Sequence, residues 1–458
     1  MNVPPASDQH IRAMDSTSQA IGSRRVELAF DIYVLIIDLV TNKYPQPEKD
    51  LKALSLTHRS LVAPCQKRLF HSVTYSDKVA RKLLDIHDAS PHLADYVRHL
   101  YLSTDHRADK TRPNEVMAAF LSKFRNLSGL ELDFRVSETS QLQYEWKNLD
   151  PAVATALLAL LSSQSRLETL AMYMIKGFPS KGILNLAKYR EHLKDFTMYS
   201  VTVDFTNIVT ATDLEASDSV APGPGRLVKC TFGAETRRAL SILTGSPESP
   251  AKNRPVLDFS STENLLVEWK NQDDLAGTKL LMQSSPHLRK LHVELPKGSR
   301  MTFRGLSTAI LGGPSKEIKE LWLSCTEPEE NKDDPLYGVC RELKRLSGNV
   351  NALDHLDIFL NIYCSEADTV INGTCMAVGL RCKALDAIVA NGNAFPALRR
   401  LSIYILVAIR DDPEFPETML ERQFRQAAMQ VEKACFKKLQ TISNLKFSFT
   451  LEMEWTLD

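Results

Sequence analysis

The sequence predicts an α/β protein in which a short N-terminal module of three helices precedes an irregular solenoid of parallel strands and helices. Two observations carry this prediction. Apolar residues recur at helical spacing between residues 28 and 69, and a short strand motif then recurs from residue 97 to residue 447. A solenoid of this kind places its strands on the concave face and its helices on the convex face.

The expected domain boundaries follow from these two patterns. Residues 1–22 are polar, contain Pro4 and Pro5 and show no periodicity, so we expect a disordered tail. Residues 23–75 form the helical module, and residues 76–458 form the repeat domain.

The N-terminal module contains three short helical patterns. The first predicts a single apolar stripe, made of Leu28, Ile32, Leu35, Ile36 and Leu39. The second and third lie at 51–56 and 61–69. Three helices in fewer than about 50 residues cannot bury every apolar side chain. Part of this surface is therefore expected to meet a partner or the neighbouring domain.

The repeat domain is recognised by the motif Leu-x-x-Leu-x-Leu or an apolar equivalent. Clear copies start at Val97, Leu127, Leu167, Leu193, Leu288, Ile318, Leu353, Leu398 and Ile442. A weaker copy starts at Leu227, and a degenerate copy lies at 265–269. The last step of the motif has the period of two that a strand with one buried face requires.

Helical segments separate the strand motifs. Asp150 and Pro151 open the clearest one, because Asp caps a helix and Pro fits its first position. The predicted helices are 115–124, 153–161, 235–243, 275–282, 336–346, 376–389 and 417–436. Polar stretches at 211–225, 244–255 and 326–336 are predicted to be inserted loops.

This alternation is typical of leucine-rich repeats, whose usual period is about 20–29 residues. The central positions Leu100, Leu130 and Leu170 are 30 and then 40 residues apart. Only Asn361, three residues after Ile358, clearly occupies the Asn position of the usual repeat turn. We therefore expect a degenerate form with long repeats.

In such a solenoid the residues beside the motif leucines point to the concave face. They are Tyr101, Glu131, Asp133, Tyr173, Tyr199, Glu268, His292, Glu294, Trp322, Asp357, Phe359 and Tyr404. Because Tyr and Trp are common interface anchors and the remainder are mostly acidic, we expect a protein partner with basic and apolar features. Ordinary exposed strand residues are the alternative interpretation.

The amino-acid composition argues against several classes of protein. Lys+Arg and Asp+Glu both number 56, and this balance argues against a nucleic-acid partner and a polybasic membrane anchor. No apolar run reaches the length of a bilayer-spanning helix, and residues 1–22 lack the apolar core of a secretion signal. The eight cysteines form no CxxC pair, so we expect reduced thiols in the cytoplasm, the nucleus or both.

Catalytic motifs are absent from the sequence. It contains no GxxxxGK[ST] loop, no GxGxxG after a strand, no GxSxG, no HExxH and no kinase signature. His87, His92, His99 and His106 lack metal-ligand spacing, as do Cys364, Cys375 and Cys382. We interpret the histidines as solvated or capping and the cysteines as core residues. The expectation is no catalytic residue, cofactor or metal, hence no enzyme.

Three stretches of the N-terminal module form a specific pattern, namely residues 26–38 (VELAFDIYVLIID), 51–61 (LKALSLTHRSL) and 65–70 (CQKRLF). With these stretches the module resembles an F-box, in the style of fungal F-box proteins with repeats behind the box. The family's proline after the first leucine is Ala29 here, its glutamate is Asp31, and its usual aromatic in the third helix is Leu61.

The resemblance implies that eight residues build the fold and its adaptor-binding surface. They are Leu28, Ile32, Ile36, Leu51, Leu54, Leu56, Leu61 and Leu69. It implies a substrate-recognition adaptor of an SCF-type (cullin-RING) E3 ubiquitin ligase, docked on the Skp-type adaptor while the repeats hold an unknown protein substrate. A repeat scaffold without a ubiquitin ligase role, capped by the N-terminal helices, is the alternative.

Overall fold

The computed structural model describes most of the chain. The described residues are 30–43, 47–103, 115–135, 142–164, 166–204, 226–246, 255–315, 317–326, 336–364, 375–410 and 417–456. The expected tail at 1–22 and the expected loop at 211–225 lie outside them, as does most of the other two loops. Two compact units divide the chain, Met1–Leu69 and Phe70–Asp458.

The first unit is a three-helix module. It consists of α1 (Phe30–Lys43), α2 (Pro47–Thr57) and α3 (Arg59–Leu69). Four buried side chains form its core, Ile37, Leu51, Leu61 and Cys65, with Tyr33, Val40, Leu54 and Leu69 packed against them. So small a core limits the stability that the module can gain from burial alone.

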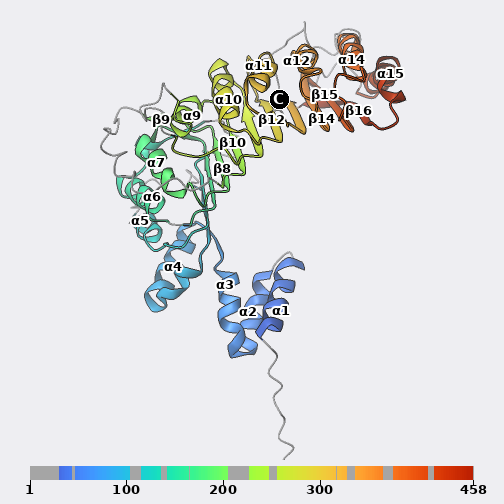
Figure 1. The fold of residues 1–458 in the computed structure, drawn as a ribbon. Coiled ribbons are helices and arrows are strands. Elements are labelled where there is room, and N and C mark those ends of the chain that lie inside the picture. The colour runs from blue at the N-terminus through green and yellow to red at the C-terminus, as the bar shows by residue number, and fades with distance from the viewer. Residues whose placement is uncertain are drawn as a thin grey trace, which may run out of the picture. The chain divides into compact units, whose positions relative to one another are not determined.

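The second unit is built on a 12-stranded sheet in which neighbouring strands pair in parallel (Figure 1). The strands, in sheet order, are β1 (Ser72–Thr74), β2 (His99–Ser103), β3 (Gly129–Asp133), β5 (Thr169–Tyr173), β8 (Asp195–Tyr199), β10 (Lys229–Phe232), β11 (Asn264–Glu268), β12 (Lys290–Leu295), β13 (Glu320–Cys325), β14 (His355–Cys364), β15 (Arg400–Arg410) and β16 (Lys446–Thr456). Spatial order follows chain order, which is the topology of a solenoid.

Helices follow the strands and gather on one face of the curved sheet (Figure 1). They are α4 (Asp77–Ala89), α5 (Glu115–Leu121), α6 (Pro151–Ser163), α7 (Ser180–Asn185), α9 (Arg237–Leu243), α10 (Gln272–Ser284), α11 (Leu306–Gly312), α12 (Val339–Leu346), α14 (Cys375–Val389) and α15 (Glu417–Cys435). Short 3-10 helices are η1 (Pro91–Tyr96), η2 (Trp146–Asn148), η3 (Leu186–Tyr189) and η5 (Leu439–Thr441). Two additional pairs of very short strands join β4 (Tyr144–Glu145) to β6 (Ile175–Lys176), and β7 (Phe178–Pro179) to β9 (Val203–Asp204).

The repeated motif sets the register of the sheet. Leu100 pairs with Leu130, and Leu130 with Leu170. The same positions continue through Leu291, Leu321, Leu356 and Leu401. These side chains are buried between the sheet and the helices in one continuous apolar cluster. Each motif therefore supplies one strand whose leucine face closes the core, as its period of two predicts.

The expected helices are present, and the local reason is visible at α6. Asp150 Oδ1 accepts a hydrogen bond from Ala152 N at 2.8 Å, so it caps the helix that Pro151 begins. Among the described α-helices of the second unit, α4, α7 and α11 were not predicted. The predicted module boundary at residue 75 also differs from the structure, because Ser72–Thr74 pairs with β2 and belongs to the sheet.

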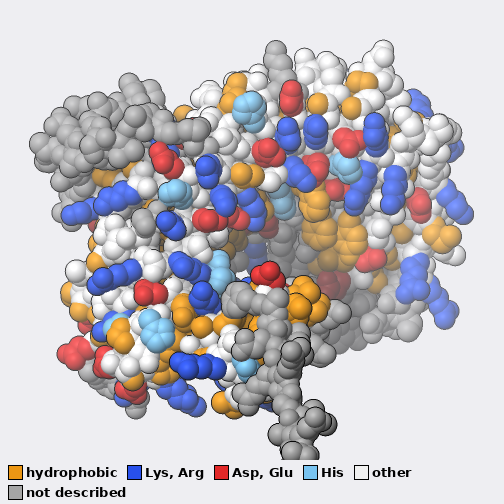
Figure 2. Space-filling model, turned by 60° about the horizontal axis from the view of Figure 1, so that its bottom comes forward, with side chains coloured by type: hydrophobic (Ala, Val, Ile, Leu, Met, Phe, Trp, Pro, Cys, Tyr) orange, Lys and Arg blue, Asp and Glu red, His pale blue; other side chains and the backbone are white. Residues whose placement is uncertain are grey.

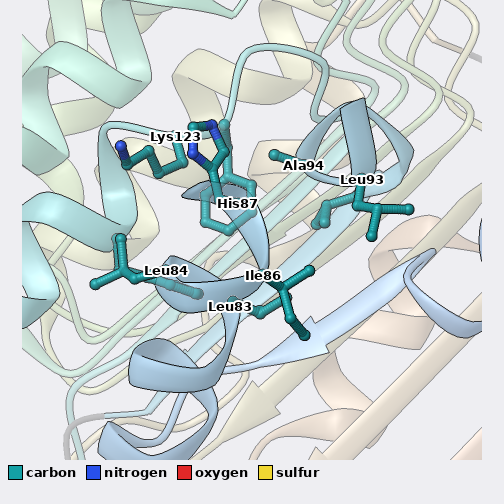
Figure 3. A pocket seen from close by; sticks show the side chains of 10 residues that line it. Leu83, Leu84, Ile86, His87, Leu93, Ala94 and Lys123 are labelled. Carbon is teal, nitrogen blue, oxygen red and sulfur yellow. The ribbon is translucent and has the colours of Figure 1, made fainter. Parts of the chain in front are cut away.

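A small cavity lies between α4, η1 and α5, with a volume of about 10 Å³ (Figure 3). Its lining is apolar except for His87 and Lys123, and it has room for about one water molecule. We interpret it as a packing void of the first repeats and place no ligand in it.

Candidate functional site

The sheet has one face that the helices leave uncovered, which we call the open face. The register arranges its side chains in two rows. The first row comprises Thr74, Tyr101, Glu131, Ala171, Thr197, Thr231, Leu266, His292, Trp322, Asp357, Ser402 and Ser448. The second row comprises Ser103, Asp133, Tyr173, Tyr199, Glu268, Glu294, Ser324, Phe359, Tyr404 and Thr450. All twelve residues named from the sequence lie in these two rows.

On β2 and β3 the open face contains the carboxylate of Asp133, which is paired with other side chains of the chain. Asp133 accepts a hydrogen bond from Tyr101 Oη at 3.0 Å and is bridged by Arg135, whose Nε lies 2.9 Å from Asp133 Oδ2. Burial raises the pKa of Asp133, but the hydrogen bonds from Arg135 outweigh burial and the pKa is lowered overall. Burial and the charge of Asp133 raise the pKa of the neighbouring Glu131. The charge of Asp133 is thus paired within the chain by Arg135.

Glu268 is a deeply buried acid of the open face. Its side chain is 3% exposed, and its Oε2 accepts a hydrogen bond from Ala234 N at 3.1 Å. Burial, with smaller contributions from Glu294 and Asp274, raises the pKa of Glu268 to about 7. Burial also raises the pKa of Glu294. A cation beside this part of the second row would favour the charged form of both carboxylates.

Gly233 explains how the backbone passes between Tyr199 and Glu268. A Cβ atom at Gly233 would lie 2.7 Å from Ser200 N and 2.9 Å from Tyr199 Cα. No side chain fits in that space, so the second row has no side chain at Gly233. The Tyr199 ring lies close to the carboxylate of Glu268. Burial and Glu268 both raise the pKa of Tyr199.

The middle of the open face is apolar and aromatic. Trp322 is 46% exposed, and its ring lies 5.8 Å from that of His292. An open depression of about 330 Å³ is bordered by both rings, Leu266 and the polar side chains of Asn264 and Lys290. Within the described residues, Asn264 Oδ1 and His292 Nε2 are buried without a hydrogen-bond partner. Burial lowers the pKa of His292, which favours the neutral imidazole.

A second aromatic pair follows on β14 and β15. The rings of Phe359 and Tyr404 are stacked, with centroids 5.0 Å apart and planes 2° from parallel. Tyr404 donates a hydrogen bond to Glu452 Oε2 at 2.6 Å, and this bond is the main reason that the pKa of Tyr404 is raised to about 12. Rigid, half-exposed aromatic rings of this kind are suited to anchor a partner side chain.

Basic residues at the strand starts are largely paired with acids of the neighbouring repeat. Lys194 lies 2.7 Å from Glu168, Lys290 lies 2.8 Å from Glu320, and Lys229 lies 3.4 Å from Asp195. Figure 2 shows the resulting mixture of basic and acidic side chains on the face that it presents. Exposed pairs of this kind contribute little stability, but they cancel charge locally. These lysines therefore add little net positive charge beside the open face.

The module of the first unit carries the other group of residues named from the sequence. Leu51 and Leu61 are buried in its core, while Ile36, Leu54 and Leu69 are half-buried. Ile32 is exposed, and Leu56 is 88% exposed. Leu28 lies outside the described residues. Leu51 and Leu61 are therefore core residues of the module, and the structure divides the sequence-based set between core and surface.

The expected single stripe on α1 is also corrected. The core-facing side of the helix is formed by Tyr33, Ile37 and Val40. Ile32, Leu35 and Leu39 point into solvent, with Leu35 59% exposed. At 3.6 residues per turn, the two sets are separated by about 130° around the helix axis. The helix thus has two apolar sides, of which the module covers one.

Some residues of these surfaces were missed from the sequence. Leu266 borders the depression, and its signal was the degenerate motif copy at 265–269. Arg135 follows its strand and had no signal in the motif, although it neutralises Asp133.

The described residues contain no group of three or more His, Cys, Asp or Glu side chains that could hold a metal ion. His106, Cys364 and Cys375 have no described side chain. Cys382 is fully buried, and burial raises its pKa well above the ordinary value. In the same part of the chain, no helix is long and apolar enough to cross a membrane.

The long parallel sheet backed by helices is consistent with a leucine-rich-repeat-like solenoid. No protein-family model matches the chain, and no curated protein matches it. Among solved structures it is similar to the leucine-rich repeat-containing protein LegL7 from Legionella pneumophila. That match has 14% identity and a TM-score of 0.30, and it covers 72% of this chain and 91% of the other.

Proposed function

We propose that this chain is a non-catalytic substrate-recognition adaptor of an SCF-type (cullin-RING) E3 ubiquitin ligase. The three-helix module would dock on the Skp-type adaptor, and the open face of the repeats would hold a protein substrate. The chain would accelerate ubiquitin transfer by proximity, because it raises the effective concentration of the substrate near the charged enzyme.

The observation that carries this proposal is the exposed apolar side of α1. Ile32, Leu35 and Leu39 face solvent on a module whose core is already closed by other residues of the same helix. Leu56 on α2 is exposed as well. Apolar groups that a module does not need for its own core are typical of a partner-binding surface. The resemblance of residues 26–70 to an F-box favours a Skp-type adaptor as the partner.

Binding to a purified Skp-type adaptor tests the docking step. The full chain is expected to bind with micromolar affinity or better, and the triple variant Ile32→Glu, Leu35→Glu, Leu39→Glu is expected to lose at least about tenfold, since each charge would be desolvated in the interface. Leu311→Glu is the matched control, because Leu311 is an exposed apolar residue of α11 in the other unit.

The outcomes of that measurement separate the proposal from its alternative. If the wild-type chain does not bind the adaptor, the repeat scaffold without a ligase role is preferred. If the chain binds but the triple variant binds equally well, the surface has been assigned to the wrong residues of α1.

Substrate recognition is proposed to use the aromatic and acidic side chains of the open face. Trp322, Phe359 and Tyr404 would anchor apolar side chains, and Glu268 and Glu294 would attract basic ones. Because the lysines at the strand starts are paired with neighbouring acids, the uncompensated charge favours a basic partner segment.

Quantitative recovery of partners from lysate tests this second surface. The double variant Trp322→Ala, Tyr404→Ala is expected to reduce the recovered substrate at least about tenfold relative to wild type. Leu311→Ala, on the helix side of the repeats, is expected to leave recovery unchanged. Equal recovery with the double variant and the wild type would show that the open face is not the recognition surface.

A further inference from the structure

The last strand of the sheet, β16, has an open edge. It extends over 11 residues, and among the described strands its one neighbour is β15. Lys446 N donates a hydrogen bond to Arg399 O at 2.7 Å. Because backbone groups alternate along a strand, the even-numbered residues turn toward β15. The odd-numbered residues Phe447, Phe449, Leu451 and Met453 therefore direct their N–H and C=O groups outward.

The side chains of β16 are also incompletely covered. Leu401 and Ile403 on β15 are fully buried, whereas their register partners Phe447 and Phe449 are only half-buried. Phe447 and Phe449 both contact Phe436, at 4.9 Å between ring centroids, so they belong to the core. The apolar layer thus reaches the edge of the sheet and remains partly exposed there. A long edge of this kind is a template for a further strand.

The sequence of β16 is complementary to itself when it is reversed about Thr450. Lys446 then lies opposite Glu454, Phe447 opposite Met453, and Phe449 opposite Leu451. Charge meets opposite charge on the open face, and apolar meets apolar on the core side. We propose that β16 pairs antiparallel with β16 of a second copy of this chain, with the two-fold axis at Thr450.

The backbone alternation fits this register. The odd-numbered residues would form the hydrogen-bonded pairs, giving about eight new backbone hydrogen bonds across the axis. The even-numbered residues would form the closer, non-hydrogen-bonded pairs, where cross-strand side chains interact most strongly. The two-fold axis would create two pairs between Lys446 of one copy and Glu454 of the other, one on each side of the axis. The two Thr450 side chains would meet on the axis. One surface then satisfies both copies, as a closed two-fold dimer requires.

The strand that pairs with β16 is assigned to a second copy of the chain, because the complementary charged and apolar residues all lie within β16 itself. An unrelated segment would have to provide an acid opposite Lys446, a base opposite Glu454 and an apolar face between them. The second copy provides all three in one register. This inference does not depend on the proposed ligase role, because it uses the free edge of β16 and neither α1 nor the aromatic and acidic side chains proposed to hold a substrate.

Charge reversal at the two ends of the strand tests the register. Both Lys446 and Glu454 are exposed, so their replacement leaves the fold intact. Analytical ultracentrifugation of the full chain over a concentration series is expected to give a dimer of twice the chain mass of 51.4 kDa. Lys446→Glu alone and Glu454→Lys alone each replace two attractive pairs by two repulsive ones. Each is expected to weaken dimerisation at least about tenfold.

The double variant Lys446→Glu, Glu454→Lys restores opposite charges and is expected to restore the dimer. Lys437→Glu, the same charge change at an exposed position before η5, is expected to leave the dimer intact. Hydrogen exchange should show protection of the odd-numbered amides from 447 to 453 as the dimer forms. A monomer at every concentration, single reversals without effect, a swap that does not restore association, or a dimer with unprotected β16 amides would each overturn the inference.

Discussion

Glu268 shows how one buried side chain couples this fold to pH. The sheet places its carboxylate beside Tyr199, Glu294 and Asp274, where burial dominates and raises its pKa to about 7. The unfolded chain ionises the same group near 4.5. Between these two pH values the folded state holds more protons than the unfolded state. This group therefore makes the protein less stable as pH rises from about 4.5 to 7, and the loss is complete above 7.

The substitution Glu268→Gln removes this titration while it keeps the shape of the side chain. The variant is expected to gain up to about 3 kcal/mol relative to wild type between pH 5 and pH 8, since each pKa unit corresponds to about 1.4 kcal/mol. Chemical denaturation of both proteins at several pH values measures the difference, in which other titrating groups cancel. A difference in unfolding free energy that does not change with pH would contradict the assignment.

At the scale of elements, α10 illustrates how a helix start is joined to the preceding repeat. Asn271 and Asp274 form a capping box, and Asp274 Oδ2 accepts from Lys270 N at 2.9 Å. Asp274 Oδ1 also accepts from Glu235 N at 2.7 Å, in the segment before α9. One buried carboxylate thus fixes the helix terminus and ties two repeats together.

Asp274→Ala is expected to lower the free energy of unfolding by at least about 2 kcal/mol, because it leaves three backbone N–H groups without their acceptor. The neighbouring Asp273 is the control. It is exposed and pairs with Arg237 on the surface, so Asp273→Ala is expected to cost less than about 1 kcal/mol. Denaturant titration of both variants compares them, and equal losses would contradict the role given to Asp274.

The three-helix module offers a similar pair on α2. Leu51 is 2% exposed and packs in the core, whereas Leu56 projects into solvent. Leu51→Ala is expected to destabilise the module by roughly 2–5 kcal/mol, which for a core of four side chains amounts to unfolding it. Leu56→Ala is expected to have no such effect. Hydrogen exchange of the α1–α3 amides in the full chain reads out both variants, and similar protection in both would refute the assignment of the core.

At the scale of the whole second unit, stability is expected to be a sum of contacts between neighbouring repeats. The strands follow one another in chain order, and hydrogen bonds join each strand only to the repeats beside it. A defect in one repeat should therefore weaken its neighbours most and distant repeats least.

Leu291→Ala, at a fully buried position of β12, tests this expectation. The cavity that it leaves should cost roughly 2–5 kcal/mol. Hydrogen exchange is expected to show the largest loss of protection in β11, β12 and β13, and little change in β2 or β16. A uniform loss along the whole sheet would mean that the unit unfolds as a single cooperative block.

Much of the repeat architecture was predictable because it is encoded locally. The motif positions from Leu100 to Leu401 alternate with period two, and one buried face is all that a strand of this sheet needs. Asp150 and Pro151 predict the start of α6 for the same reason, since a helix cap depends on residues within one turn. The sequence by itself thus determined the order of most strands and helices, and it also identified the aromatic and acidic residues of the open face.

Tertiary structure decided the features that depend on distant neighbours. Either apolar side of α1 could have formed the core, and only packing against α2 and α3 selected Tyr33, Ile37 and Val40. The burial of Glu268 and the bridge from Arg135 to Asp133 likewise arise from adjacent strands. The half-covered Phe447 and Phe449 follow from the place of β16 at the end of the sheet. A periodic pattern specifies which side chains share a face, whereas what covers that face is set by residues far away in the chain.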